Sequence, residues 1–338
     1  MVPGEHRVGA AGAKRRLPGM AGDQLRPSRG GRMRTLLFGP NGQVGWELRR
    51  SLAPLGELIP LGRHEWQGLR GDLTDKDAIA HAIRSLRPDL IVNAAAYTAV
   101  DQAESEPEQA RLINATAPGV MAELAREQQA LFIHYSTDYV FDGSGDRPWH
   151  EDDPTAPLNV YGQTKREGEE AVRAADGHHL IFRTAWVYAA RGHNFIRTMI
   201  RLACQRDTLQ VINDQHGAPT GAELIADVTA HAARTASTRP DLRGTYHLTA
   251  AGETTWHGYA RFVIEQARAG GAPVRVAPEA IEAVATDAFP TVARRPHNSR
   301  LDGHKLETTF GLKRPDWRSG VARALQEMDI SHTQGRPD

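Results

Sequence analysis

The stretch TLLFGPNGQVG (residues 35–45) decides the fold class of this chain. It begins with a short apolar run, typical of a fully buried strand, and continues into glycines spaced three apart, Gly39, Gly42 and Gly45. Apolar residues then recur at helical spacing over residues 44–55. A glycine turn between a strand and a helix leaves backbone N–H groups free for a pyrophosphate, which the helix macrodipole also favours. The stretch therefore predicts a dinucleotide-binding unit.

Downstream, short apolar runs continue to alternate with helix-length segments. Strands are predicted at 58–61, 90–93, 131–136 and 180–183, and helices at 77–86, 107–128 and 163–174. This alternation indicates βαβ units and a parallel sheet covered by helices on both faces. Beyond Trp186 the pattern loosens and prolines become frequent. The sequence therefore predicts an α/β fold, a Rossmann-like doubly wound parallel sheet with a smaller C-terminal substrate-binding lobe.

These patterns divide the chain into three parts. Residues 1–32 carry seven basic against two acidic side chains and no apolar periodicity, so we expect a disordered basic leader. Residues 33–187 are predicted to form the NAD(P)-binding Rossmann-like domain, to which the chain returns around 212–250. Residues 188–338 are predicted to form mainly the substrate-binding lobe.

The composition excludes several classes of protein. The 338 residues include 41 basic and 41 acidic side chains, and this balance argues against a dedicated nucleic-acid binder. No run approaches the roughly 20 apolar residues of a membrane span. The single cysteine, Cys204, excludes an intrachain disulfide framework. We expect a cytoplasmic protein with neither a nucleic-acid nor a membrane partner.

Tyr161 and Lys165 form the second motif with chemistry. Their spacing of four residues places both side chains on one face of a helix. A free tyrosine has a pKa of about 10, and a fixed ammonium beside it is expected to lower that pKa by favouring the phenolate. Thr137, after the predicted strand 131–136, is placed to bind the same substrate oxygen. The alternative is a helix-surface pair contributing about 0.2–0.5 kcal/mol, but the glycine turn favours a catalytic site.

The end of the second predicted strand bears on the choice of cofactor. An NAD-preferring fold usually offers the ribose an acid at this place, whereas this strand ends in Gly62, Arg63 and His64. Arg63 is suited to a 2′-phosphate, which indicates NADPH or the use of both cofactors. The alternative is a solvated arginine. Asp72 follows in a position to accept a hydrogen bond from the adenine amine.

Four runs of sequence resemble the dTDP-4-dehydrorhamnose reductase family of the extended short-chain dehydrogenase/reductase superfamily. They are GQVGWELRRSLAP (42–54), STDYVFDG (136–143), RTAWVY (183–188) and INDQHGAPTGAEL (212–224). The glycines and the Tyr-x-x-x-Lys motif alone indicate only the superfamily. The four runs together are specific, and the resemblance covers about residues 33–328.

The resemblance implies reduction of the 4-keto group of dTDP-4-dehydro-β-L-rhamnose by NADPH or NADH, in the supply of cell-envelope polysaccharide. Tyr161 would protonate the developing alkoxide, Lys165 would hold the nicotinamide ribose, and Thr137 would adjust the pKa of Tyr161. The positions that match cofactor contacts of the family are Gly42, Gln43, Val44, Asp72, Leu73, Ala96, Tyr97 and Thr98. Thr137, Asp138 and Trp186 match positions that touch the sugar nucleotide. Trp186 would otherwise be a core tryptophan.

The resemblance also implies a homodimer around Mg²⁺, because some relatives hold this ion with glutamates that match Glu47 and Glu223. The alternative is that the two glutamates are solvated surface groups. Two other functions stay open. One is another NDP-sugar epimerase or dehydratase of the superfamily, and the other is a non-catalytic regulatory subunit resembling that of methionine adenosyltransferase.

Overall fold

The computed structural model describes residues 32–64 and 67–328. The predicted leader, residues 1–32, lies outside the described residues except for Arg32. No helix in the described ranges is long and apolar enough to cross a membrane.

Six strands form one parallel sheet. They are β1 (Met33–Phe38), β2 (Gly56–Leu61), β3 (Leu90–Asn93), β4 (Leu131–Thr137), β5 (His179–Thr184) and β10 (Gly244–His247), in the order β10-β5-β4-β3-β1-β2. The direction of winding reverses between β1 and β3, which are neighbours. In such a sheet, ligands bind outside the carboxyl ends of the strands at this switch point.

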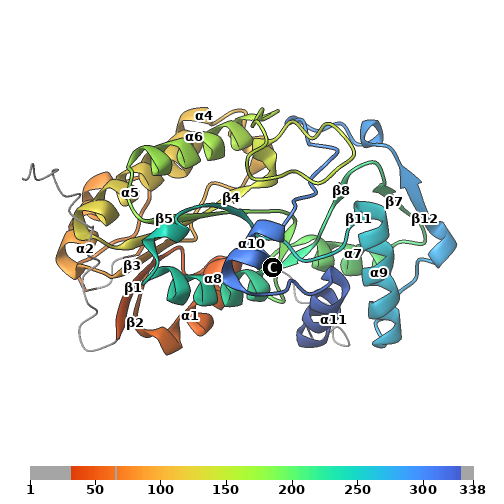
Figure 1. The fold of residues 1–338 in the computed structure, drawn as a ribbon. Coiled ribbons are helices and arrows are strands. Elements are labelled where there is room, and N and C mark those ends of the chain that lie inside the picture. The colour runs from red at the N-terminus through yellow and green to blue at the C-terminus, as the bar shows by residue number, and fades with distance from the viewer. Residues whose placement is uncertain (1–31, 65–66, 329–338) are drawn as a thin grey trace, which may run out of the picture.

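Helices cover both faces of the sheet (Figure 1). One face carries α2 (Lys76–Leu86), α4 (Pro107–Arg111), α5 (Ala117–Gln128) and α6 (Val160–Ala174), and the other carries α1 (Gln43–Ser51), α8 (Ala222–Ala236) and α10 (His304–Phe310). The strand β1 explains the two layers, because successive side chains of a strand point to opposite faces. Leu36 and Phe38 enter one buried cluster, and Leu37 enters the other. The predicted doubly wound sheet is confirmed.

Local sequence sets the helix boundaries. The first helix ends at Ser51 rather than at 55, because Pro54 has no N–H to continue the hydrogen-bond ladder. Helix α6 begins three residues before the predicted start, since the side chain of Asn159 accepts a hydrogen bond from the Gly162 N–H at 2.8 Å. Tyr161 therefore lies in the first turn of α6. The predicted helix 107–128 is α4 and α5 joined by a π-helical turn, Leu112–Thr116.

A smaller lobe lies beside the sheet (Figure 1). Its elements are β6 (Val187–Tyr188), α7 (Phe195–Gln205), β7 (Leu209–Ile212), β8 (His216–Gly217), β9 (Thr220–Gly221), β11 (Thr254–Thr255), α9 (Trp256–Ala269), β12 (Ile281–Val284) and α11 (Trp317–Glu327). It has its own core, which includes Tyr188, Tyr259 and Trp317. Between its segments, α8 packs against α1 and β10 extends the sheet beside β5. The remaining elements are α3 (Val100–Ala103) and 3₁₀ turns at Ala53–Leu55, Asp138–Val140, Pro240–Leu242, Pro278–Ala280 and Thr286–Ala288.

Candidate active site

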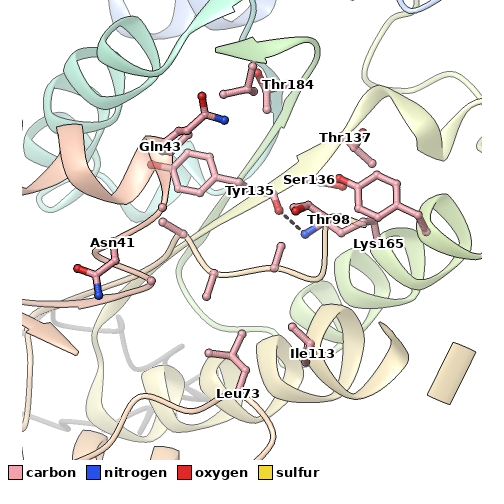
Figure 2. A pocket seen from close by; sticks show the side chains of 18 of the residues that line it. Asn41, Gln43, Leu73, Thr98, Ile113, Tyr135, Ser136, Thr137, Lys165 and Thr184 are labelled. Carbon is pink, nitrogen blue, oxygen red and sulfur yellow. Dashed lines mark hydrogen bonds between the residues drawn. The ribbon is translucent and has the colours of Figure 1, made fainter. Parts of the chain in front are cut away.

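A cavity of about 1070 Å³ lies at the carboxyl ends of the central strands and reaches the smaller lobe. Sites for small molecules usually measure about 300–1,000 Å³, so this one has room for a large ligand or for two ligands. Most of the predicted site residues line it: Gly39, Gly42, Gln43, Val44, Arg63, Asp72, Leu73, Ala96, Thr98, Thr137, Asp138, Tyr161, Lys165 and Trp186. Figure 2 shows Asn41 and Gln43 on one side of the cavity and Thr137 and Lys165 on the other.

The glycine turn forms one wall of the cavity. Gly39 has a φ of +75°, and a Cβ there would lie 2.6 Å from the Ala95 nitrogen. Gly45 does not line the cavity, but a Cβ there would lie 1.9 Å from the Gly39 carbonyl oxygen, so it lets α1 approach the turn. No side chain caps the start of α1 at Gly42. The first N–H groups of the helix are therefore left for a ligand, and an anion is favoured there.

Arg63 and Asp72 lie at the β2 end of the same cavity. The Asp72 carboxylate accepts hydrogen bonds from the N–H and hydroxyl of Thr74 at 3.0 and 2.9 Å, and these bonds lower the pKa of Asp72. Asp72 is thus an ionised acceptor beside an arginine. This end of the cavity therefore offers the Asp72 carboxylate as an acceptor for an amine and the Arg63 guanidinium as a donor for a phosphate.

Tyr97 does not line the main cavity. It lines a smaller neighbouring pocket, which it shares with Arg63, and its hydroxyl donates to Glu106 at 2.8 Å. Its backbone is held by Asn114 in the π-helical turn, which accepts from the Tyr97 N–H at 2.8 Å and donates to its carbonyl at 3.1 Å. These bonds fix the loop that brings Ala96 and Thr98 to the cavity.

Thr137, Tyr161 and Lys165 meet in the cavity as expected, but their electrostatics differ from the prediction. Burial raises the pKa of Tyr161 to about 12, although a hydrogen bond with Thr137 acts in the opposite direction. The Lys165 amine donates to the Tyr135 carbonyl at 2.6 Å and contacts His134 Nε2 at 3.2 Å. Burial lowers the pKa of Lys165 to about 8. The predicted lowering of the Tyr161 pKa by Lys165 is therefore wrong for this structure, because burial outweighs the other effects and β4 holds the Lys165 amine.

Asp138 is buried beside Thr137. The Thr137 hydroxyl donates to Asp138 Oδ1 at 3.0 Å and accepts from the Tyr139 N–H at 3.2 Å. Burial raises the pKa of Asp138 to about 6, while hydrogen bonds from Ser299 and Thr137 oppose this rise. The carboxyl group therefore changes charge close to neutral pH.

Two tryptophans form the wall of the cavity in the smaller lobe. Trp186 stacks on Trp256 with 3.8 Å between ring centroids and 16° between planes. Trp186 has a φ of +49°, which is costly for a side chain of this size, and a Cβ at Gly217 would lie 2.7 Å from its indole. Sequence reasoning missed Trp256. Its only local signal is its place after Thr255, whose hydroxyl caps α9 by accepting from the Gly258 N–H at 3.0 Å.

The two glutamates predicted to hold Mg²⁺ lie on the packed helices α1 and α8, outside the cavity. Glu47 accepts a hydrogen bond from Arg50 at 3.3 Å. Burial raises the pKa of Glu223, and the nearby carboxylates of Glu327 and Glu47 act in the same direction. Among residues 32–64 and 67–328, no group of three or more potential ligands is placed to hold a metal ion. The magnesium site stays a prediction.

Comparison with known proteins decides the family. Residues 33–330 match the family described as RmlD substrate binding domain. The dTDP-4-dehydrorhamnose reductase of Escherichia coli (strain K12) is 58% identical over 296 residues, which are 88% of this chain and 98% of the relative. The chain belongs to the dTDP-4-dehydrorhamnose reductase family.

Solved structures agree with membership of the dTDP-4-dehydrorhamnose reductase family. The family member from Bacillus anthracis str. Ames, in complex with NADP, superimposes with a TM-score of 0.79 at 31% identity, covering 88% of this chain and 99% of that one. A dTDP-glucose 4,6-dehydratase, DesIV from Streptomyces venezuelae, has a TM-score of 0.70 at 21% identity, covering 87% and 96%. At that identity the dehydratase shares only the fold, so the dehydratase alternative gains no support from it.

Proposed function

We propose that this chain is an NAD(P)H-dependent oxidoreductase that reduces the 4-keto group of dTDP-4-dehydro-β-L-rhamnose to give dTDP-L-rhamnose. One observation carries the proposal. A single cavity joins the glycine turn of a dinucleotide site to Thr137, Tyr161 and Lys165 in a chain 58% identical to a reductase of this name.

The residues present fit a nicotinamide dinucleotide. The backbone at Gly45 lies close to the Gly39 carbonyl, and this contact places the uncapped start of α1 at the cavity. A pyrophosphate there can accept hydrogen bonds from the first N–H groups of the helix. Arg63 at the far end suits a 2′-phosphate, and Asp72 suits the adenine amine. When bound, the reduced cofactor supplies a hydride to C4 of the sugar.

The proton comes from Tyr161 in this proposal. Burial keeps its phenol protonated at neutral pH, which is the form that can protonate the C4 oxygen as negative charge develops there. Thr137, hydrogen-bonded to Tyr161, orients the phenol, and Lys165 holds the ribose of the cofactor. Trp186 and Trp256 offer the sugar nucleotide an apolar wall, and Asp138 borders the same space.

The remaining expectations form part of the proposal. Residues 33–187, with the return around 212–250, would bind the cofactor, and residues 188–338 would mainly bind the sugar nucleotide. We also propose a cytoplasmic homodimer. Mg²⁺ at Glu47 and Glu223 would lie outside the cavity, and we assign it no step of the reduction.

The test is direct mixing of the full-length protein, NADPH and the 4-keto sugar nucleotide. We expect loss of absorbance at the reduced nicotinamide band and a product heavier than the substrate by two hydrogens. Conversion of the sugar without net consumption of NADPH would instead indicate an epimerase or dehydratase. No turnover, together with tight binding to a methionine adenosyltransferase, would indicate the regulatory subunit.

A further inference from the structure

His134 and Asn93 lie behind Lys165 and do not line the cavity. Both are buried, on β4 and β3, which are adjacent strands with these two residues paired in register. His134 Nε2 is 3.2 Å from the Lys165 amine, and His134 Nδ1 is 3.3 Å from Asn93 Nδ2. The hydrogen bond from Lys165 to the Tyr135 carbonyl is drawn in Figure 2. Both groups that hold the Lys165 amine therefore belong to strand β4.

The hydrogen bonds in this chain fix which atoms carry protons. The Ala95 backbone N–H can only donate, and it donates to Asn93 Oδ1 at 3.1 Å, so the Asn93 amide nitrogen faces His134. That nitrogen also can only donate, so His134 Nδ1 must accept. A neutral imidazole then carries its proton on Nε2, which points at Lys165. An ammonium has no lone pair to accept this proton, whereas a neutral amine has one.

The charges around Lys165 permit a neutral amine. Burial is the larger cause that lowers the pKa of His134, so the ring is neutral. The carboxylate that acts on Lys165 is that of Glu169, one turn along α6, and it is bound by Arg183 and Arg173. Tyr161, the other titratable group on this face of α6, stays a phenol. None of these groups supplies an unpaired negative charge that would require an ammonium.

We propose that Asn93 and His134 are positioning residues that favour the neutral amine of Lys165 over the ammonium in the ligand-free enzyme. Lys165 becomes an ammonium by taking one proton from solvent. The His134 ring must then carry its proton on Nδ1 instead of Nε2, and the hydrogen bond from the Asn93 amide to Nδ1 is lost. The pair thereby sets the pH range over which Lys165 changes from an ammonium to an amine at the place where it would hold the ribose of the cofactor. Only this last consequence rests on the proposed function, since the charge of Lys165 can be measured without substrate.

The experiment is an NMR titration of the ligand-free, full-length protein with ¹³Cε-labelled lysine. The chain has only five lysines, and Lys165→Met assigns the resonance of interest. We expect Lys165 to titrate at least one pH unit below the value of about 10.4 for free lysine. Thr35→Val, a buried change on β1, is the control and should leave this midpoint unchanged.

Two variants test the pair separately. In Asn93→Ser the new hydroxyl can accept a hydrogen bond from His134 Nδ1–H. In His134→Gln the new carbonyl can accept a hydrogen bond from the Lys165 ammonium. Because both changes favour the ammonium, both should raise the titration midpoint of Lys165 by one pH unit or more. The pH profile of kcat/KM should shift in the same direction. A wild-type Lys165 that titrates with the exposed lysines would overturn the proposal, as would an unchanged midpoint in both variants. If His134→Gln fails to fold, Asn93→Ser alone decides.

Discussion

The buried ion pair between Glu169 and Arg183 joins the catalytic helix to the sheet, so its loss should destabilise the protein and the site together. Arg183 on β5 donates Nε and Nη2 to the two carboxylate oxygens of Glu169 at 2.8 and 2.7 Å, and the two side chains are 3% and 0% exposed. Glu169→Gln keeps the shape but turns amide hydrogens toward the guanidinium. It leaves Arg183 as a buried charge without its counter-ion.

Removing one partner of a buried pair costs about 3–5 kcal/mol, which is roughly a 10²–10⁴-fold change in the unfolding equilibrium constant. The assay is urea unfolding followed by fluorescence, with Glu170→Gln as a matched control on the same helix. Glu170 is 56% exposed and pairs with Arg166, and exposed pairs contribute little to stability. Equal midpoints for Glu169→Gln and Glu170→Gln would refute the reasoning.

The same pair predicts a pH dependence of stability. Burial acts to raise the pKa of Glu169, but the hydrogen bonds and charge of Arg183 outweigh it and lower the pKa below the ordinary value. A carboxyl whose pKa is lowered by folding stabilises the protein at neutral pH, and this contribution is lost as the pH falls through the folded pKa. We expect the acid limb of the stability curve to be flatter in Glu169→Gln than in the wild type.

Three further changes have distinct expected outcomes. Trp256→Leu removes the ring that stacks on Trp186 and should raise KM for the sugar nucleotide about tenfold while the Kd for NADPH, from fluorescence titration, stays unchanged. Gly45→Ala places a Cβ 1.9 Å from a backbone oxygen and should weaken NADPH binding at least tenfold; an unchanged Kd would contradict the role of this turn. Burial raises the pKa of Asp138 to about 6, so its contribution to stability is full below its unfolded value of about 3.9 and is lost as the pH rises through 6. Asp138→Asn should therefore raise the urea midpoint at pH 7 relative to the midpoint at pH 4.5, in comparison with the wild type, and an equal change at both pH values would contradict this.

The sequence predicts those parts of the site that depend on local spacing and on strand ends. Gly39 and Thr137 meet because parallel strands bring their carboxyl ends to one edge, and Tyr161 and Lys165 share a helix face because they are four residues apart. These relations survive errors of several residues in helix boundaries. Helix α6 begins three residues before its predicted start, yet Tyr161 and Lys165 still reach the cavity.

Other features depend on packing between distant segments, and no local pattern encodes them. The stacking of Trp186 on Trp256 requires the approach of β6 and α9 in the smaller lobe. The pKa of Tyr161 follows from burial, which spacing along a helix does not determine. The Lys165 amine contacts His134 on β4. The sequence predicts this strand, but it does not predict that the amine of Lys165 points toward it.

The central claim is that the phenol of Tyr161 supplies the proton when the sugar ketone is reduced. The most direct measurement compares Tyr161→Phe with the wild type in NADPH oxidation by the 4-keto sugar nucleotide, alongside the Kd for NADPH. Phenylalanine keeps the edge-on ring contact with Tyr139, at 5.6 Å between centroids, so cofactor affinity should stay the same. We expect kcat/KM to fall by about 10²–10⁴-fold, the usual contribution of general acid catalysis. A variant that reduces the ketone at nearly the wild-type rate would contradict the claim.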